Sequence, residues 1–263
     1  MSEAIVSLRD LRFCYGKEAP LVLDDLSLAI PKGSVTAILG PNGCGKTTLL
    51  HILLGRLQPL RGEIMLDGRD QNGYTRKAMS QLIGLVPQDE DVPFEFSVLE
   101  YVVLGRAPFL GLLDSPTEAD YRLAAAAIAE VGIDALAQRP VPSLSGGERQ
   151  LARLARALAQ EPALMLMDEP TSHLDISNQG RVLNLIHRLV SKQTKTVVFT
   201  THDPTSAASI ADYVILLKGG QTVAAGAAEA VITAPNLFTV YNTPVEVHRL
   251  HGRLVVLAPE PRG

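Results

Sequence analysis

Apolar runs and alternating apolar and polar positions predict β-strands at both ends of the chain. Residues 4–13 and 21–30 alternate, as half-buried antiparallel strands do. Residues 34–39 form a short run rich in β-branched and apolar side chains, which is typical of a buried strand. Two more runs of this kind follow at 163–167 and 195–201. The pattern therefore predicts an α/β frame to which both halves of the chain contribute.

Turn residues and local alternation predict the remaining short elements. We expect strands at 62–68 and 83–87, a hairpin over 213–224 that turns at Lys218-Gly219-Gly220, a small helix near 227–233, and a final strand pair, 245–247 and 254–256, joined across His251-Gly252.

Between residues 97 and 160 the pattern changes to that of helices. Two Ser-x-x-Glu sequences have the spacing of a capping box, in which the serine and glutamate side chains satisfy backbone N–H groups at a helix start. A threonine begins a further, alanine-rich helix, which a glycine ends. The expected starts are Ser97, Thr117 and Ser145, the expected end is Gly132, and a loop is expected over 106–111.

Two further helices are predicted after this block. One covers about 176–190, and the other runs from the cap Asp203, with Pro204 at its first position, to about Ile210. We therefore predict one domain over 1–263, in which a helical block of about 89–160 is inserted in an α/β core and a small β extension covers about 235–258.

The segment after the strand at 34–39 has the strand, glycine loop and helix order of a phosphate-binding loop. Glycines let backbone N–H groups approach phosphate oxygens, and the helix N-terminus favours negative charge. Lys46 would reach the β- and γ-phosphates, and the Thr47 hydroxyl would bind Mg²⁺. A tight turn with an ordinary lysine is the alternative, which the flanking elements disfavour. The expected phosphate contacts are Gly40, Pro41, Asn42, Gly43, Cys44, Gly45, Lys46, Thr47 and Thr48.

Composition narrows the class of protein. The chain has 263 residues, 46% of them hydrophobic, which suffices for a sizeable core. Its net charge of −4 gives no sign of a nucleic-acid partner. We find no apolar run of membrane-spanning length and expect no secretory leader. The cysteines, Cys14 and Cys44, have no spacing typical of a disulfide framework or metal site, which fits a reducing cytoplasm.

Polar residues that could act on a bound phosphate follow three of the predicted strands. Asp168 and Glu169 end the strand at 163–167, where ligands bind in open α/β sheets. Asp168 would hold Mg²⁺ through water, and Glu169 would be the base that polarises the attacking water. His202 follows the strand at 195–201 and could contact the γ-phosphate. Gln88 follows 83–87 and could reach Mg²⁺ or the attacking water. Each has a plainer interpretation, as a charged turn, a surface histidine or a solvated amide.

With these residues in view, the chain resembles the nucleotide-binding subunits of ABC transporters over nearly its whole length. The specific match is Leu144-Ser145-Gly146-Gly147-Glu148-Arg149-Gln150, which looks like the complete ABC signature. The resemblance implies a P-loop NTPase core with an antiparallel β subdomain and a helical subdomain. It also implies that Ser145, Gly146 and Gly147 bind the γ-phosphate of ATP held by a second copy, paired head to tail.

The resemblance assigns the other motifs one at a time. Gln88 matches the Q-loop glutamine, Asp168 and Glu169 match the Walker-B acids, and His202 matches the switch histidine. Ser172-His173-Leu174-Asp175 matches the D-loop, with Asp175 as its acid. Tyr15 matches the aromatic residue that stacks on adenine, although Phe13 is a near alternative. The implied substrate and cofactor are ATP and Mg²⁺, and the implied activity is ATP hydrolysis.

Two stretches favour one group of importers. The first comprises residues 86–88, 93–100 and 104–108, and the second is Thr171-Ser172-His173-Leu174-Asp175-Ile176; both resemble the iron-siderophore, heme and cobalamin group. That implies two separate membrane permease subunits, indirectly a substrate-binding protein, and a peripheral place on the cytoplasmic face of the inner membrane. The permease would dock near 88–115, where we expect exposed apolar residues such as Phe94, Phe96, Phe109 and Leu110 to cluster.

Alternatives remain for the cargo and the class. The stretch Asp89-Glu90-Asp91 is more acidic than that group leads us to expect, so molybdate or tungstate import stays open. A soluble ABC ATPase usually has a second cassette or a long coiled-coil insertion, and we expect neither here. An exporter subunit is a third possibility, which 93–108 disfavours. Finally, Cys44 at a helix N-terminus is expected to have a lowered thiol pKa and to react readily, unless its position merely tolerates a small side chain.

Overall fold

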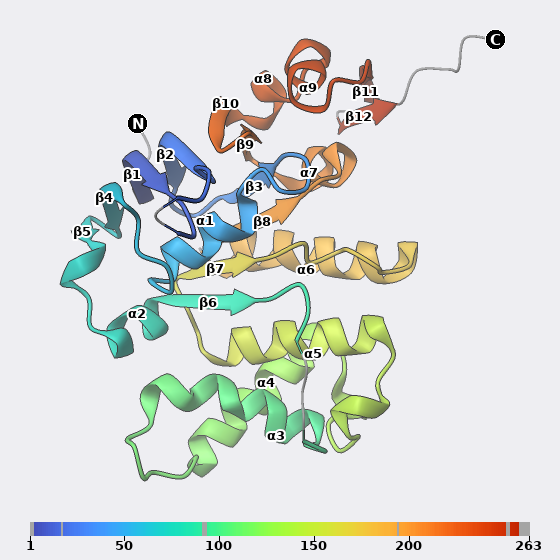
Figure 1. Cartoon of the computed structure of the whole chain (residues 1–263). Coiled ribbons are helices and arrows are strands. Elements are labelled where there is room, and N and C mark those ends of the chain that lie inside the picture. The colour runs from blue at the N-terminus through green and yellow to red at the C-terminus, as the bar shows by residue number, and fades with distance from the viewer. Residues whose placement is uncertain (1–2, 17, 91–93, 194, 251–252, 258–263) are drawn as a thin grey trace. The chain divides into compact units, whose positions relative to one another are not determined.

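The computed structural model describes residues 3–16, 18–90, 94–193, 195–250 and 253–257 (Figure 1). The chain forms two compact units, of which unit 1 comprises Met1–Gly73 and Val190–Gly263 and unit 2 comprises Tyr74–Leu189. Asp91, His251 and Gly252, which the sequence predictions name, lie outside the described part of the chain, as does residue 93 at the start of the stretch 93–108.

An antiparallel sheet in unit 1 confirms the strands predicted near the N-terminus. Its order is β2-β1-β4-β5, and β1 pairs with both β2 and β4. Inward-facing positions of β1, such as Val6 and Leu8, are buried, as the alternation predicts. The strands are β1 (Ala4–Phe13), β2 (Leu23–Pro31), β4 (Arg61–Leu66) and β5 (Arg69–Asp70), followed by the 3₁₀ turn η1 (Gln71–Gly73).

A second set of strands in unit 1 carries the phosphate-binding loop. The central strand β3 (Val35–Leu39) is buried at every position and pairs in parallel with β8 (Thr196–Thr201) and β9 (Tyr213–Lys218). Burial on both faces accounts for the continuous apolar runs of these strands. The hairpin predicted over 213–224 is present, because β9 pairs antiparallel with β10 (Gln221–Ala227). The carboxyl ends of β3 and β8 meet at one edge, where Leu39 pairs with Thr201.

Helices and a final hairpin complete unit 1. Helix α7 (Pro204–Ile210) begins at the predicted cap Asp203 and contacts the last strand. The other elements are α1 (Lys46–Leu53), α8 (Ala228–Val231), α9 (Ala234–Tyr241), β11 (Glu246–Leu250) and β12 (Arg253–Leu257), the last two paired antiparallel.

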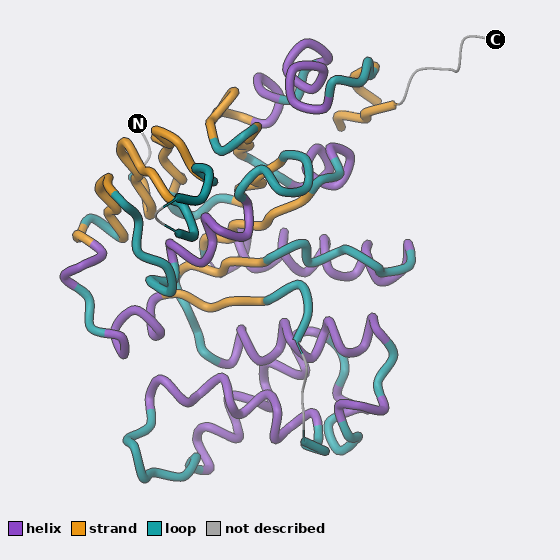
Figure 2. The backbone as a smooth tube through the Cα atoms, viewed as in Figure 1, coloured by secondary structure: helices purple, strands orange, loops and turns teal. Residues whose placement is uncertain are grey.

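Unit 2 contains a parallel strand pair and most of the helices. Strands β6 (Ile83–Val86) and β7 (Leu164–Met167) pair in register, Val86 with Met167. Between them the chain is mostly helical, as Figure 2 shows, which confirms the change of pattern seen in the sequence. Helix α2 (Arg76–Leu82) precedes β6, and α6 (Ile176–Gln193) follows β7 and continues into unit 1. The helical elements between the two strands are α3 (Val98–Val103), η2 (Leu104–Phe109), α4 (Glu118–Val131), η3 (Asp134–Leu136), η4 (Val141–Ser143) and α5 (Gly146–Ala159).

The predicted helix starts are correct in detail. Capping boxes begin α3 at Ser97, α4 at Thr117 and α5 at Ser145, and Gly132 ends α4 in the left-handed conformation. The predictions missed α2 and α9, and they placed a loop where η2 forms. Within the described ranges, no helix combines the length and apolar character needed to cross a membrane.

Candidate functional site

The loop between β3 and α1 has the backbone of a phosphate cradle. Gly43 and Gly45 have φ values of 77° and 103°, a left-handed region that side chains rarely adopt. Gly40 has no room for a side chain, since a Cβ there would lie 2.7 Å from Sγ of Cys44. Gly45 is also the N-cap of α1 and provides no side-chain cap, so nearby backbone N–H groups have no capping side chain. The loop therefore presents the donors that an anion requires.

Lys46 lies within this loop rather than in solvent. Its side chain is buried, at 6% exposure, and its ammonium donates to the carbonyl oxygens of Gly40, at 2.8 Å, and Pro41, at 3.2 Å. A buried ammonium is stable only where such acceptors surround it. Thr47, the next residue, is exposed. The positive charge is thus held at the loop, as a phosphate site requires.

The exposure of the ring differs between Tyr15 and Phe13, the two candidates for stacking on adenine. Phe13 is buried in the sheet at 4% exposure, whereas Tyr15 is 64% exposed. Their rings make an edge contact with centroids 5.0 Å apart, and the Tyr15 hydroxyl lies 2.9 Å from the Thr48 hydroxyl. Tyr15 is therefore the aromatic residue with a free face beside the loop, while its stacking on adenine stays a prediction.

His202 lies in unit 1 directly after β8, whose carboxyl end is paired with that of β3. It follows β8, and the N–H of Gly40 donates to the carbonyl of Thr201 at 3.4 Å. The next residue, Asp203, caps α7 by accepting hydrogen bonds from Thr205 N, at 2.9 Å, and Ser206 N, at 3.0 Å. The His202 side chain is exposed, and its loop borders the start of the phosphate-binding loop.

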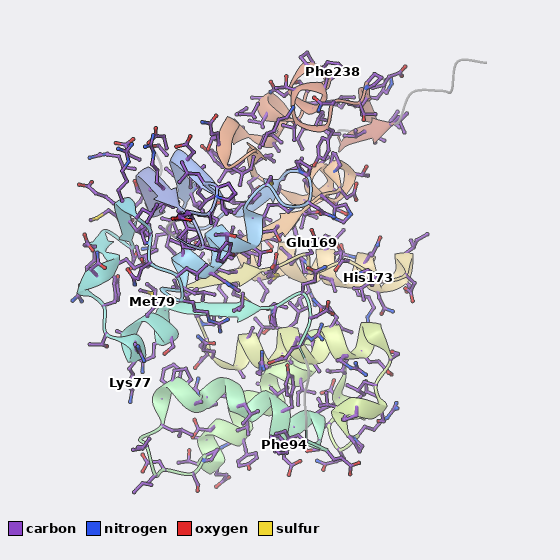
Figure 3. The ribbon with its side chains drawn as sticks, in the orientation of Figure 1. Lys77, Met79, Phe94, Glu169, His173 and Phe238 are labelled. Atoms are coloured by element: carbon purple, nitrogen blue, oxygen red, sulfur yellow. The ribbon has the colours of Figure 1, made fainter. Side chains whose placement is uncertain are left out.

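In unit 2, the acids after β7 are held in a tight turn. Asp168 is buried at 7% exposure, and its N–H donates to the carbonyl of Val86 at 2.9 Å. Glu169 adopts a left-handed φ of 44°, and its carbonyl accepts from both N and Oγ of Ser172. Such a backbone costs about 1–3 kcal/mol and is typical of functional sites. Figure 3 shows Glu169 and His173 in the loop that joins β7 to α6.

The backbone of Gln88 is held by the helix that begins at the signature. The guanidinium of Arg153 on α5 donates to the carbonyl oxygens of Gln88, at 2.8 Å, and Glu90, at 3.2 Å. Gln150, one turn earlier, accepts from Arg153 at 3.2 Å and donates to the carbonyl of Pro170 at 3.1 Å. Buried side chains of α5 thus connect the Gln88 loop to the turn that follows Glu169.

The signature forms an open helix N-terminus. Glu148 accepts a hydrogen bond of 2.8 Å from Ser145 N, while Ser145 Oγ accepts one of 3.3 Å from Glu148 N. The bond from Ser145 N, and after it a side-chain hydrogen bond from Ser145 to the carboxylate, hold the pKa of the Glu148 carboxyl below its usual range. Ser145 and Gly146 are exposed, and a Cβ on Gly146 would meet nothing within 4 Å. A helix N-terminus favours an anion, and binding of a second copy's γ-phosphate at this end of α5 stays a prediction.

Asn178 on α6, which the sequence did not indicate as functional, contacts both Gly147 and the D-loop acid Asp175. Asn178 on α6 donates to Asp175 through its backbone N, at 2.8 Å, and its Nδ2, at 3.0 Å. The same amide packs on Gly147, where an added Cβ would lie 2.6 Å from its Cγ. The glycine is therefore needed for packing, whatever its role toward phosphate.

Cys44 contradicts the prediction of a readily ionised thiol. Its side chain is only 4% exposed, and burial raises the thiol pKa, although the nearby Lys46 charge acts in the opposite direction. The prediction counted the helix N-terminus and the lysine, and it omitted desolvation because the sequence does not reveal burial. Cys44 instead fills the space beside Gly40.

A ring of contacts around Glu90 was also missed. Its carboxylate accepts from the Tyr101 hydroxyl at 2.5 Å and pairs with Arg156 at 2.6 Å. Burial raises the pKa of the Tyr101 phenol, so the phenol keeps its proton for this bond. In the sequence, the acidity of residues 89–91 leaves the identity of the cargo open. In the structure, Glu90 connects its loop to α3 through Tyr101 and to α5 through Arg156.

The donor set suits a hard cation that also binds phosphate. Among the described residues, no group of three or more His, Cys, Asp or Glu side chains could hold a metal ion. Mg²⁺ does not need one, because it keeps several waters and binds through one or two protein oxygens together with substrate phosphates. Thr47 of unit 1 carries a hydroxyl oxygen, and Gln88 and Asp168 of unit 2 carry an amide and a carboxylate oxygen, so each predicted ligand is of that chemical type, while their joint binding of Mg²⁺ stays a prediction.

Comparison with known proteins agrees with this geometry. The model of the ABC transporter family matches residues 23–172. The molybdate import ATP-binding protein MolC of Haemophilus influenzae is 39% identical over 93% of this chain and 90% of its own. The ferric enterobactin transport ATP-binding protein FepC of Escherichia coli is 38% identical over 92% and 89%.

A solved structure extends the likeness to three dimensions. It is described as a metal-chelate type ABC transporter in an inward-facing conformation, and it superposes with a TM-score of 0.84 at 36% identity, covering 97% of this chain and 96% of that one. The fold is that of an ABC ATPase, as the sequence predicted. The chain therefore belongs to the ABC transporter family, among the ATP-binding subunits that hydrolyse ATP to power transport.

Proposed function

We propose that the protein is the ATP-hydrolysing subunit of an importer that takes up iron bound to a chelator such as a siderophore. The observation that carries the proposal is the likeness to FepC over 92% of the chain, together with that to a metal-chelate type transporter. Heme and cobalamin belong to the same group of predicted cargoes. Energy would come from ATP, and the cargo would pass through separate permease subunits.

The residues of the phosphate-binding loop have defined tasks in this proposal. Backbone N–H groups within the loop from Gly40 to Thr48, in which Pro41 alone has no N–H, and the ammonium of Lys46 hold the phosphates. Thr47, Asp168 and Gln88 are the proposed Mg²⁺ ligands, and the ion, when bound, neutralises charge on the transferred phosphoryl group. Phosphoryl transfer depends mostly on such positioning and charge neutralisation.

Glu169 and His202 are proposed to act on the attacking water. Glu169 accepts a proton from that water as a general base, and its strained, fixed backbone supports a set direction for the side chain. His202 holds the γ-phosphate end of the substrate. Tyr15 stacks its exposed ring on the adenine.

A second copy of the chain is proposed to complete each site. ABC ATPase cassettes form dimers and work with membrane permease subunits. Ser145, Gly146 and Gly147 would face the nucleotide of the other copy, with Asp175 beside them. The N-terminus of α5 supports this, because Ser145 and Gly146 are exposed there and a Cβ on Gly146 would meet nothing within 4 Å.

The permease would bind the exposed apolar residues that follow the Gln88 loop. Of the four residues predicted to be exposed, Phe94 and Phe109 are exposed, whereas Phe96 and Leu110 are half-buried. Leu112 and Leu113, which the prediction did not name, are almost fully exposed. Exposed apolar side chains in such a group commonly mark an interaction site. The protein would then lie peripherally on the cytoplasmic face of the inner membrane, and a substrate-binding protein would deliver the cargo on the other side.

Molybdate or tungstate import is the second candidate, and the 39% identity to MolC favours it. Coexpression with the membrane subunits of its operon, copurification, and uptake of labelled cargo would separate the two. The proposal predicts copurification and ATP-dependent uptake of a ferric chelate, abolished by Glu169→Gln. Uptake of molybdate alone would support the second candidate, and failure to copurify with any membrane subunit would point to a non-transport ABC ATPase.

A further inference from the structure

The hydroxyl of Tyr241, the last residue of α9, reaches the backbone of His202. It donates a hydrogen bond of 3.1 Å to the His202 carbonyl, and both residues belong to unit 1. The other side of the same peptide group is also held, since Asp203 N donates to Thr201 Oγ1 at 3.0 Å. Both polar atoms of the peptide between His202 and Asp203 are therefore bonded.

The two hydrogen bonds to the peptide between His202 and Asp203 restrict the direction in which the His202 side chain leaves the backbone. A peptide group is planar, so the orientation of the His202 carbonyl sets the ψ angle of His202. The residue on the other side, Thr201, is already held in β8 by its pairing with Leu39. With both neighbours held, the exposed imidazole has a defined starting direction from the strand end beside Gly40.

Tyr241 is itself anchored to the strands of unit 1. The ammonium of Lys218, at the end of β9, donates to the Thr239 carbonyl, at 2.5 Å, and to Asn242 Oδ1, at 2.9 Å. These two acceptors flank Tyr241 in the sequence. Val240, the preceding residue, is buried at 2% exposure. The hydroxyl is thus placed by a strand that pairs with β3 and not by a loosely attached tail.

We infer that Tyr241 is a positioning residue for His202, through which the segment after β10 tunes ATP hydrolysis. The inference rests on the proposed role of His202 at the γ-phosphate. Tyr241 does not touch the substrate in this account. It acts by restricting the peptide that carries the histidine, so its loss should lower the turnover number and leave the affinity for ATP nearly unchanged.

The test is a pair of kinetic measurements on the full-length chain with Mg²⁺ and ATP. Tyr241→Phe removes only the hydroxyl, and we expect kcat to fall about 3- to 10-fold with KM within about twofold, as the loss of one hydrogen bond predicts. In a His202→Ala background, the same substitution should change kcat less than about twofold, because nothing remains to be positioned.

The matched control is Thr239→Val, which removes a hydroxyl on the same helix that, within the described ranges, donates to the Pro235 carbonyl of its own helix. It should keep the wild-type kcat and melting temperature. A Tyr241→Phe variant with wild-type kcat would overturn the inference, and so would an equal loss with and without His202. If His202→Ala leaves kcat unchanged, the proposed role of His202 is wrong. If His202→Ala lowers kcat but Tyr241→Phe has the wild-type kcat, only the inference about Tyr241 is wrong.

Discussion

The guanidinium of Arg153 donates a hydrogen bond of 2.8 Å to the backbone carbonyl of Gln88. This bond joins the helix of the signature to the loop of the proposed Mg²⁺ ligand. Because the Arg153 side chain is buried, its removal leaves the carbonyl acceptors of Gln88 and Glu90 without their donor. The loop would then be free to move, and the Gln88 amide with it.

We therefore predict that Arg153→Met lowers both stability and turnover. The free energy of unfolding should fall by about 1–3 kcal/mol, and kcat should fall several-fold, with a higher Mg²⁺ concentration needed for half-maximal rate. Arg188→Met is the control, because Arg188 also donates to a carbonyl, that of Glu130, but on an exposed surface. Equal Mg²⁺ dependence in wild type and Arg153→Met would refute the link to Gln88.

The contact between Gly147 and Asn178 leads to a second prediction. The effect of Gly147→Ala on the free energy of unfolding should change sign when Asn178 is removed. Alanine favours a helix over glycine by about 1 kcal/mol, but a Cβ at Gly147 would collide with the Asn178 amide, which is held by Asp175. Overpacking costs about 1–3 kcal/mol, so Gly147→Ala should destabilise the protein.

The clash disappears in an Asn178→Ala background. There, Gly147→Ala should raise the free energy of unfolding, by up to about 1 kcal/mol. Chemical denaturation of the four proteins measures both effects. Destabilisation of similar size in both backgrounds would show that Asn178 is not the obstacle.

Cys44 should react slowly despite its place in the phosphate-binding loop. Its folded pKa lies above the ordinary value, so the thiolate that alkylating reagents require is scarce at neutral pH and increases only as pH rises toward that pKa. We expect iodoacetamide to modify the half-buried Cys14 faster than the buried Cys44 at pH 7.5, as read by mass spectrometry of peptides. Preferential labelling of Cys44 at that pH would restore the expectation of a lowered pKa.

Local sequence chemistry predicted much of the fold. The capping boxes at Ser97 and Ser145 and the glycine stop at Gly132 depend on residues three or four positions apart, and they were located correctly. Helix α9 was missed, although Thr233 as its N-cap and Pro235 near its start are local signals of a helix start. The phosphate-binding loop was recognisable because its residues are contiguous.

The supporting contacts could not be predicted in the same way. Arg153 lies 65 positions from Gln88, and Tyr241 lies 39 from His202, so each pair meets only in the folded chain. The pKa shift of Cys44 was predicted in the wrong direction, because the direction of the shift depends on burial, which is known only in the folded chain. Candidate chemical groups are visible in a sequence, whereas the residues that hold them in place require the structure.

Release of phosphate from ATP by the purified chain and its Glu169→Gln variant tests the central claim most directly. With Mg²⁺ present, the wild type should hydrolyse ATP. The variant should do so at least about 100-fold more slowly, as expected for loss of a general base. It should still bind ATP and elute as a dimer in its presence, because the phosphate-binding loop and signature are intact. Turnover by Glu169→Gln close to that of the wild type, or no hydrolysis by the wild type, would contradict the account.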